Sequence, residues 1–199
     1  MNLKKKIKLK TMKINYFMFL VFILFSCQED NYKECADLTY GTDYIKITGV
    51  SESDKNYFKY FCKTTEIFGI KIYATNKVDN EKMLHAASIL AEYLDNDEDG
   101  QVDNQKVVDK LIEKNVWLLL VKNESDQNDA ERINLKNSNY QDLRDEEITL
   151  VNGSPRFDAS LEEVLHLITQ HGYAKVYPEV FGEKKGSKHL KELERAERK

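Results

Sequence analysis

An aspartate-rich stretch, Asp95 to Asp103, constrains the fold of this chain more than any other feature of the sequence. Side-chain oxygens fall at loop positions 1, 3, 5 and 9 around a glycine at position 6, which is the layout of an EF-hand-type calcium loop. Ca²⁺ takes about six to eight oxygen ligands, and a chain supplies alternate side chains to one ion only by curling around it. Gly100 permits the sharp turn that this path requires. The stretch therefore predicts two helices joined by a cation-binding loop.

The loop offers a partial set of calcium ligands. The predicted ligands are the carboxylates of Asp95, Asp97 and Asp99, the backbone carbonyl of Gln101, and Asp103, which binds directly or through a water. At position 12, Lys106 stands where an EF-hand has a bidentate glutamate. We therefore expect a lower affinity than that of a calcium sensor, unless another carboxylate completes the site. The alternative is an acidic, solvated turn between two helices.

Helical periodicity on both sides of the loop supports a helix-loop-helix over residues 80–114. The apolar residues at helical spacing are Met83, Ala86, Ala87, Leu90 and Leu94 before the loop, and Val107, Val108, Leu111 and Ile112 after it. His85 lies beside the apolar stripe of the first helix. We expect it to be a hydrogen-bonded, partly buried histidine, and a role in a site is the alternative.

The amino terminus indicates the compartment. A lysine-rich segment precedes an apolar run, Tyr16 to Phe25, that is too short to span a bilayer as a stable helix. Leu24-Phe25-Ser26-Cys27 resembles a bacterial lipobox, in which a leader is removed before a lipid-carrying cysteine. Residues 1–26 are therefore predicted to be a lipoprotein signal peptide, and residues 27–43 the lipidated Cys27 with its tether. An uncleaved membrane anchor is the alternative.

The residues after the lipobox refine this prediction. Gln28-Glu29-Asp30 is similar to a surface-export signal of some Gram-negative lipoproteins. The expected location is the bacterial cell envelope, with the lipid anchor in the outer membrane. The anchor makes the membrane one partner, and an envelope or extracellular protein or peptide is the other expected partner.

Charge and cysteine content narrow the function classes further. Without residues 1–26 the chain has 24 basic and 34 acidic side chains, so its net charge is about −10. Such a charge suits cation binding and argues against nucleic acid as a partner. Cys35 and Cys62 remain once Cys27 carries lipid, and in an oxidising envelope they are expected to form a disulfide. Two free buried thiols are the alternative.

The remaining chain, residues 44–199, is predicted to be a single α+β domain. Its expected parts are the calcium-binding helix-loop-helix, a small mixed sheet packed with it, and a C-terminal helical part. The predicted elements are strands at 44–50, 67–74 and 116–121, a surface excursion with at most one helical turn at 122–147, a short edge strand at 148–151, a turn at 152–155, a helix at 161–170 ended by Gly172, and a charged helix at 188–199.

The string Glu162-Glu163-Val164-Leu165-His166 is a second candidate for chemistry. Zinc peptidases of the HExxH type place two histidines four residues apart on one helix face, and the intervening glutamate polarises the attacking water. Here Glu162 occupies the first ligand position, Glu163 the general-base position and His166 the second ligand position. The string is thus similar to an EExxH variant of a zincin helix, which implies catalysis by Glu163 and zinc on Glu162 and His166.

Other interpretations of this helix need no metal. Ser160 and Glu163 fit a capping box, and Glu162 with His166 fits a solvated i,i+4 pair. A degenerate zincin site without activity is a further alternative. His171 falls on the other flank of the apolar stripe and could join only if the helix unwound at Gly172. The downstream candidates for a third ligand are His189, Glu192, Glu179 and Glu183, and no spacing singles one out.

Two strings carry a resemblance to known proteins. MLHAASILAEYLDNDEDGQVDN and FDASLEEVLHLITQHGYAKVYPEVFG are similar to segments of uncharacterised secreted proteins and lipoproteins of bacteria and some marine eukaryotes. The resemblance covers about residues 80–195 and implies that the loop and the EEVLH helix belong to one domain. It implies no catalytic assignment. Such relatives continue past the equivalent of Leu193-Glu194-Arg195-Ala196, so truncation of this chain, with loss of a third metal ligand, stays open.

Two function classes follow from these observations. The first is a calcium-stabilised, lipid-anchored surface domain that binds a partner without chemistry. The second is a lipid-anchored, zincin-like hydrolase in which calcium is structural. We favour the first, because the sequence shows every residue it requires, whereas the second needs a further ligand that the sequence does not show.

Overall fold

The computed structural model describes Cys35 and residues 37–51, 61–131, 139–151, 155–182 and 185–198. The predicted signal peptide and Cys27 lie outside these residues, as does most of the turn expected at 152–155. The acidic loop, the EEVLH helix and the charged C-terminal helix all lie within them.

The described residues form a six-stranded mixed sheet in which the strands lie in sequence order. The strands are β1 (Thr39–Gly41), β2 (Lys46–Gly49), β3 (Lys63–Ile67), β4 (Ile70–Ala74), β5 (Val116–Val121) and β6 (Asn139–Arg144). β1 to β4 pair antiparallel, whereas β4, β5 and β6 pair in parallel. The predicted class, α+β with a mixed sheet, therefore holds. β1 lies within the segment predicted to be a tether.

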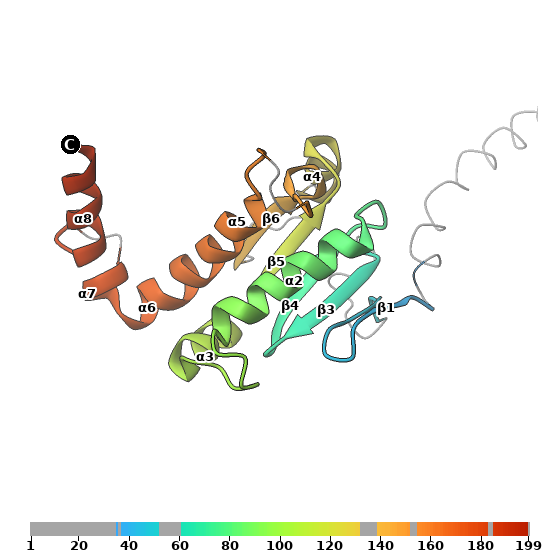
Figure 1. The fold of residues 1–199 in the computed structure, drawn as a ribbon, viewed down its shortest axis with the longest axis horizontal. Coiled ribbons are helices and arrows are strands. Elements are labelled where there is room, and N and C mark those ends of the chain that lie inside the picture. Colours follow the sequence, from blue (N-terminus) through green and yellow to red (C-terminus); the bar gives the residue numbers. More distant parts are fainter. Residues whose placement is uncertain are drawn as a thin grey trace, which may run out of the picture.

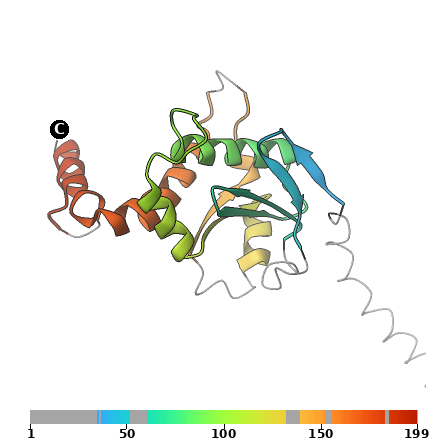
Figure 2. The same ribbon diagram turned by 90° about the horizontal axis from the view of Figure 1, so that it is seen from below.

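Helices cover both faces of this sheet. They are α2 (Asn80–Leu94), α3 (Gln105–Glu113), α4 (Glu124–Glu131), α5 (Ala159–Ile168), a π-helix η4 (Thr169–Tyr173), α6 (Ala174–Val176), α7 (Pro178–Phe181) and α8 (Lys188–Glu197), with a short 3₁₀ turn η3 (Asp145–Glu147) after β6. α2 and α4 lie on opposite sides of the sheet (Figure 2). The segment from α6 to α8 extends away from the sheet (Figure 1).

Strand β5 is the centre of the core because both of its faces are buried. Leu118 and Leu120 pack in the larger hydrophobic cluster with residues of α2, α3 and α5. Trp117 and Leu119 point to the other face, where Trp117 lies edge-on to Tyr73 with ring centroids 5.5 Å apart. A parallel strand covered on both faces is expected to be a continuous apolar run, and VWLLLV is such a run. This predicted strand is confirmed.

The strand predicted at 67–74 is confirmed over Ile70–Ala74, which is β4, but its predicted start is wrong, because residues 67–69 belong to the end of β3 and a tight turn. β3 ends at Ile67 and β4 begins at Ile70, with the two paired antiparallel. The two turn residues between them have positive φ, 48° at Phe68 and 83° at Gly69. Such a two-residue turn matches the twist of the flanking strands. A phenylalanine at the first turn position hid the hairpin, since Asn or Gly is usual there.

The interpretation of residues 122–147 as a surface excursion is also wrong. This segment contains α4 and the edge strand β6, which pairs in parallel with all of β5. Residues 148–151, predicted to be the edge strand, form no strand. β6 has the polar sequence NYQDLR, and only Leu143 in it is buried. An edge strand with so few buried positions lacks the apolar pattern on which strand prediction depends.

The helix predicted at 161–170 does not end at Gly172. α5 runs from Ala159 to Ile168 and continues through the π-helix η4 into α6. Gly172 is buried, and a Cβ added to it would lie 2.7 Å from Cγ1 of Val107 in α3. This glycine therefore permits a close approach of two helices, instead of terminating one.

A disulfide joins Cys35 to Cys62, with their Cα atoms 5.5 Å apart. It links the residues just before β1 to the start of β3. Disulfides persist in oxidising compartments, so this bond indicates a location outside the cytoplasm. In the part of the chain that the structure describes, no helix has the length and apolar character needed to cross a membrane.

Candidate functional site

The acidic loop connects α2 to α3, as the helix-loop-helix prediction requires. α2 ends at Leu94, and α3 begins at Gln105 after its N-cap Asn104, whose side chain accepts a hydrogen bond from the backbone N–H of Val107. Both helices contribute buried apolar residues to the larger core cluster. The loop ends are thus fixed by packing of the helices on either side.

Three carboxylates converge at the start of this loop. Asp95, Asp97 and Asp99 each offer one oxygen, and these oxygens lie within 4.8 Å of one another. Asp95 is buried, whereas Asp97 and Asp99 are exposed. These residues hold positions 1, 3 and 5 of an EF-hand-type loop, so the group could hold a metal ion such as calcium.

Backbone amides hold the loop in shape. The Asp95 carboxylate accepts hydrogen bonds from the N–H groups of Asp99, at 3.1 Å, and Gly100, at 2.9 Å. Asp103 accepts one from the N–H of Asn96 at 3.0 Å. Gly100 has φ of +84°, and a Cβ there would meet nothing within 4 Å, so its conformation, not space, requires glycine. The loop is therefore curled around the carboxylates by its own backbone.

The carboxylates repel one another. The Asp99 carboxylate raises the pKa of Asp97 above its ordinary value; slight desolvation and the charges of Asp103 and Asp95 add to the rise, and a hydrogen bond with the Asp99 backbone opposes it. A bound cation would offset this repulsion. Lys106, at position 12, lies in the first turn of α3 and is exposed. Because its side chain is positively charged, it is not one of the three converging ligands.

Helix α5 does not begin with the predicted Ser160–Glu163 capping box. Its N-cap is Asp158, whose carboxylate accepts hydrogen bonds from the backbone N–H of Ser160 at 3.2 Å and from its hydroxyl at 2.5 Å. The other Asp158 oxygen lies 2.6 Å from Nε2 of His85. The prediction of a Ser160–Glu163 box is wrong, because an aspartate two residues earlier provides the cap. The prediction of a hydrogen-bonded, partly buried His85 is confirmed.

Glu163 does not cap α5, and its side chain faces strand β6. Its carboxylate accepts a hydrogen bond from Nε2 of Gln141 at 2.6 Å. Burial raises the pKa of Glu163, although the nearby His166 and the Gln141 hydrogen bond oppose the rise. His166 Nδ1 lies 3.6 Å from Glu163 Oε2, and Nε2 lies 3.9 Å from Glu162 Oε1. Both Glu162 and His166 expose more than half of their side chains.

Over the residues that the structure describes, the downstream ligand candidates form no group of three with Glu162 and His166 that could hold a metal ion. His189 lines the same shallow hollow as His166, of about 190 Å³, whereas His171 does not line it. Among the described residues, Asp95, Asp97 and Asp99 are the only acid, histidine or cysteine group of three whose ligand atoms lie within 4.8 Å. Glu183 lies outside the described residues.

A charged cluster at the carboxyl ends of the parallel strands was not predicted. Asp145, which follows β6 and is 1 % exposed, accepts hydrogen bonds from Lys122 at 2.7 Å, Lys82 at 3.1 Å and the N–H of Asp79 at 2.8 Å. Burial alone would raise the pKa of Asp145, but these hydrogen bonds outweigh it and hold the pKa below its ordinary value. Because it joins β5, β6 and the start of α2, the cluster stabilises the fold. Its members are far apart in sequence, so no local motif reveals it.

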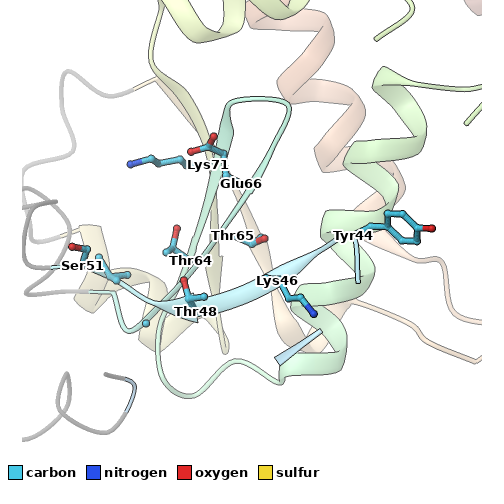
Figure 3. A pocket seen from close by; sticks show the side chains of 10 residues that line it. Tyr44, Lys46, Thr48, Ser51, Thr64, Thr65, Glu66 and Lys71 are labelled. Atoms are coloured by element: carbon cyan, nitrogen blue, oxygen red, sulfur yellow. The ribbon is translucent and has the colours of Figure 1, made fainter. Parts of the chain in front are cut away.

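A hollow of about 430 Å³ lies over β2, β3 and β4 (Figure 3). Thr48 and Thr64 are register partners within it, and Glu66 lies opposite Lys71. Opposite charges on neighbouring strands attract each other across the sheet surface. Since Glu66 is the single acid lining this hollow in the described part of the chain, the hollow is a poor cation site.

Comparisons with known proteins identify no family for this chain. No protein-family model, no curated protein sequence and no solved structure matches it. The resemblance to uncharacterised secreted proteins and lipoproteins therefore stays a prediction, and the loop and helix geometry carry the functional argument.

Proposed function

We propose that this chain is a lipid-anchored protein of the bacterial cell envelope whose folded part is stabilised by calcium bound in the Asp95–Asp103 loop. The observation that carries the calcium part is the convergence of three carboxylates within 4.8 Å in a loop shaped by its own backbone amides. The carbonyl of Gln101 and the Asp103 carboxylate are the proposed remaining protein ligands. Water completes the coordination in place of the missing glutamate.

The expected affinity follows from the ligand set. Extracellular calcium modules bind with dissociation constants of about 10⁻⁴–10⁻³ M, whereas sensors bind far more tightly. Lys106 at position 12 and the exposed positions of Asp97 and Asp99 favour the weaker range. A weak site fits a calcium-rich surrounding and a structural role. In this role, calcium fixes α3 against the end of α2.

The envelope part of the proposal is supported by the lipobox-like Leu24-Phe25-Ser26-Cys27 and by the disulfide between Cys35 and Cys62. Lipid on Cys27 would anchor the chain in the outer membrane, leaving the α+β part to bind an envelope or extracellular protein or peptide. A net charge of about −10 without residues 1–26 argues against nucleic acid. Metabolic labelling with a palmitate analogue tests the anchor, and Cys27→Ser should abolish the label.

Calcium content and affinity test the site. Residues 28–199 of the wild type should bind one Ca²⁺ by calorimetry, and Asp97→Asn should weaken binding at least tenfold. Asp109→Asn is the matched control, since it removes one exposed carboxylate of α3 outside the loop and should leave the affinity unchanged. Equal affinity in the wild type and Asp97→Asn would contradict the assignment.

A zincin-like, metal-dependent hydrolase is the second candidate, and one observation favours it. Glu163 does not cap the helix, and it lies beside His166 with a raised pKa, as a general base beside a metal ligand would. Glu162 and His166 would hold zinc, with Glu163 as the catalytic base. The test is zinc-dependent peptide hydrolysis that Glu163→Gln abolishes without loss of bound zinc. Hydrolysis retained in Glu163→Gln would exclude this mechanism.

A further inference from the structure

Helix α5 carries two side chains of zinc-ligand type on its exposed side. Glu162 and His166 lie one turn apart, with Oε1 of the glutamate 3.9 Å from Nε2 of the histidine, and both side chains are more than half exposed. Two ligands of one tetrahedral zinc ion lie about 3.3 Å apart, given zinc–ligand distances of about 2.0–2.1 Å. A small side-chain adjustment would therefore let these two residues, which we call the ligand pair, fill two of the four positions around one zinc ion.

The histidine of the ligand pair is held from behind by a carboxylate. Nε2 of Gln141 on β6 donates a hydrogen bond to Oε2 of Glu163 at 2.6 Å, and the same oxygen lies 3.6 Å from Nδ1 of His166. A metal-binding histidine usually directs its second ring nitrogen to a carboxylate or carbonyl, which fixes the ring and leaves the other nitrogen for the metal. Here Nδ1 faces a carboxylate fixed to the sheet, and Nε2 faces Glu162. This support is an observation independent of the ligand pair itself, and it points to a metal on Nε2.

A single chain does not complete the site within the described residues. Structural zinc sites have four protein ligands in a tetrahedral arrangement. No further histidine, cysteine or acid of the described chain joins Glu162 and His166 in a group whose ligand atoms lie within 4.8 Å of one another. Two ligand pairs, one from each of two copies, would supply the four ligands.

Exposed apolar side chains lie next to the ligand pair. Phe157, just before α5, is 65 % exposed, and Leu161 and Leu165 on α5 are 41 % and 51 % exposed. The two leucines lie one turn apart, and each directly precedes a member of the ligand pair in the sequence. The leucine row and the ligand pair therefore run side by side along the helix. Large apolar side chains exposed together are typical of a surface that contacts another molecule.

A second copy of the chain suits this surface because the two rows are self-complementary. Two α5 helices placed antiparallel about a two-fold axis bring one ligand pair opposite the other and leucine against leucine. Two glutamate carboxylates also balance the charge of one Zn²⁺ ion. The helix has 10 residues and is about 15 Å long, so its apolar contact is small for a stable dimer. Association should therefore depend on the metal.

We propose that Glu162 and His166 of two copies of this chain bind one zinc ion and join the copies through α5. Glu163 is a positioning residue that orients the histidine ring. Because the protein fills all four positions, the ion is structural and no position is left for a reacting water. This inference rests on the ligand pair of the second candidate function and is independent of the calcium site. It differs from the hydrolase in stoichiometry, with one zinc ion for two chains instead of one for each chain.

Sedimentation equilibrium of residues 28–199, titrated with zinc chloride, tests the proposal. Millimolar calcium in every sample keeps the acidic loop from competing for zinc. The protein should be monomeric without zinc, and conversion to the dimer should be complete at about one zinc ion for two chains. Elemental analysis of the dimer should give the same ratio. A chain that stays monomeric at saturating zinc would overturn the proposal, as would one zinc ion per chain.

Variants of α5 test each part of the interface. His166→Ala should abolish the zinc-dependent dimer. Glu163→Gln should still dimerise, but it should require about 10- to 100-fold more zinc, because the orienting carboxylate is lost. Leu161→Ser combined with Leu165→Ser keeps all four ligands and should weaken the zinc-loaded dimer by about tenfold or more. A zinc-loaded dimer of unchanged affinity in His166→Ala would show that the copies meet elsewhere and would overturn the proposal.

Two matched controls place the zinc. His189→Ala removes the other histidine that lines the same hollow as His166, and Asp97→Asn removes one carboxylate of the acidic loop. Both should dimerise as the wild type does. Loss of zinc binding in His189→Ala would mean that one chain completes the site, and loss in Asp97→Asn would place the zinc in the loop; either result would overturn the proposal. Failure of the loop to bind calcium would contradict the proposed function and leave the zinc-dependent dimer unaffected.

Discussion

The Asp95–Asp103 loop holds its carboxylates with backbone amides, whereas the Glu162–His166 face of α5 leaves its groups to solvent or to a neighbouring strand. In the loop, the Asp95 carboxylate accepts hydrogen bonds from two backbone N–H groups, and three ligand oxygens lie within 4.8 Å of one another. On α5, Glu162 and His166 are more than half exposed. A site that the backbone assembles binds its ion at a lower cost in side-chain entropy. The loop is therefore the better candidate for a metal site, although α5 carries the more familiar catalytic string.

The largest expected effect is the stabilisation of the fold by calcium, which should depend on the loop and not on α5. A ligand that binds only the folded state at 100 times its dissociation constant adds about 2.7 kcal/mol to the free energy of unfolding. We expect calcium to stabilise the wild type and Glu163→Gln by this amount in chemical denaturation, and Asp97→Asn at the same calcium concentration by far less. Equal stabilisation of all three proteins would remove the distinction between the two regions.

Gly172→Ala tests the packing that joins the two regions. The added Cβ would lie 2.7 Å from Cγ1 of Val107, closer than real contacts allow, so α3 or η4 must shift. Overpacking of this kind costs about 1–3 kcal/mol in the free energy of unfolding. Urea denaturation measures the loss, and the double variant Gly172→Ala with Val107→Ala should lose less than the two single variants together. Full additivity would show that the two side chains do not compete for this space.

Asp158→Ala tests the true start of α5. The substitution removes the helix cap and leaves His85 without its carboxylate partner, so we expect a loss of about 0.5–2 kcal/mol. Ser160→Ala, which keeps the cap, should lose less. A larger loss in Ser160→Ala would restore the capping box that the sequence suggested.

The same aspartate has a defined pH dependence. Burial would raise the pKa of Asp158, but hydrogen bonds from Ser160, His85 and Thr149 lower it below its ordinary value. A lowered folded-state pKa stabilises the protein fully above the ordinary aspartate pKa, and this stabilisation is lost as the pH falls through the folded-state value. The stability difference between the wild type and Asp158→Asn should therefore shrink on acidification below the ordinary aspartate range. A difference that grows in acid would reverse the assigned direction.

Glu163→Gln should have the smallest effect on stability. Burial raises the pKa of Glu163, so the charged form is not favoured by its surroundings, and glutamine can still accept the hydrogen bond from Gln141. We expect a change within about 0.5 kcal/mol in thermal or chemical denaturation. A loss well above this value would give Glu163 a structural role that its contacts do not explain.

The accuracy of the sequence predictions depended on whether the signal was local. The helix-loop-helix, the buried strand at 116–121 and the positions of the loop carboxylates follow from residues within a few positions of one another, and the structure has all of them. The hairpin at Phe68 and Gly69 was missed because its turn residues are atypical. β6 was missed because an edge strand buries too few side chains to show a pattern.

The remaining features depend on contacts between distant segments. Asp145 joins Lys82 of α2 and Lys122 just after β5, and Glu163 faces Gln141 on β6, so no single motif contains either partner set. Gly172 looked like a helix terminator because the approach of α3 is invisible in the local sequence. The helix cap was assigned to Ser160 because Ser and Asp cap equally well, and only the structure shows at which residue the helix begins.

The most direct test of the central claim is a calcium titration of ¹⁵N-labelled residues 28–199 followed by amide NMR spectra. If the loop binds calcium, the amide signals of Asp99, Gly100 and Gln101 should shift the most and reach a plateau at saturation. The shifts should be absent from Asp97→Asn and present in Asp109→Asn. Loop amides that stay unchanged at millimolar calcium, or shifts spread evenly over all acidic surfaces, would contradict a calcium site in this loop.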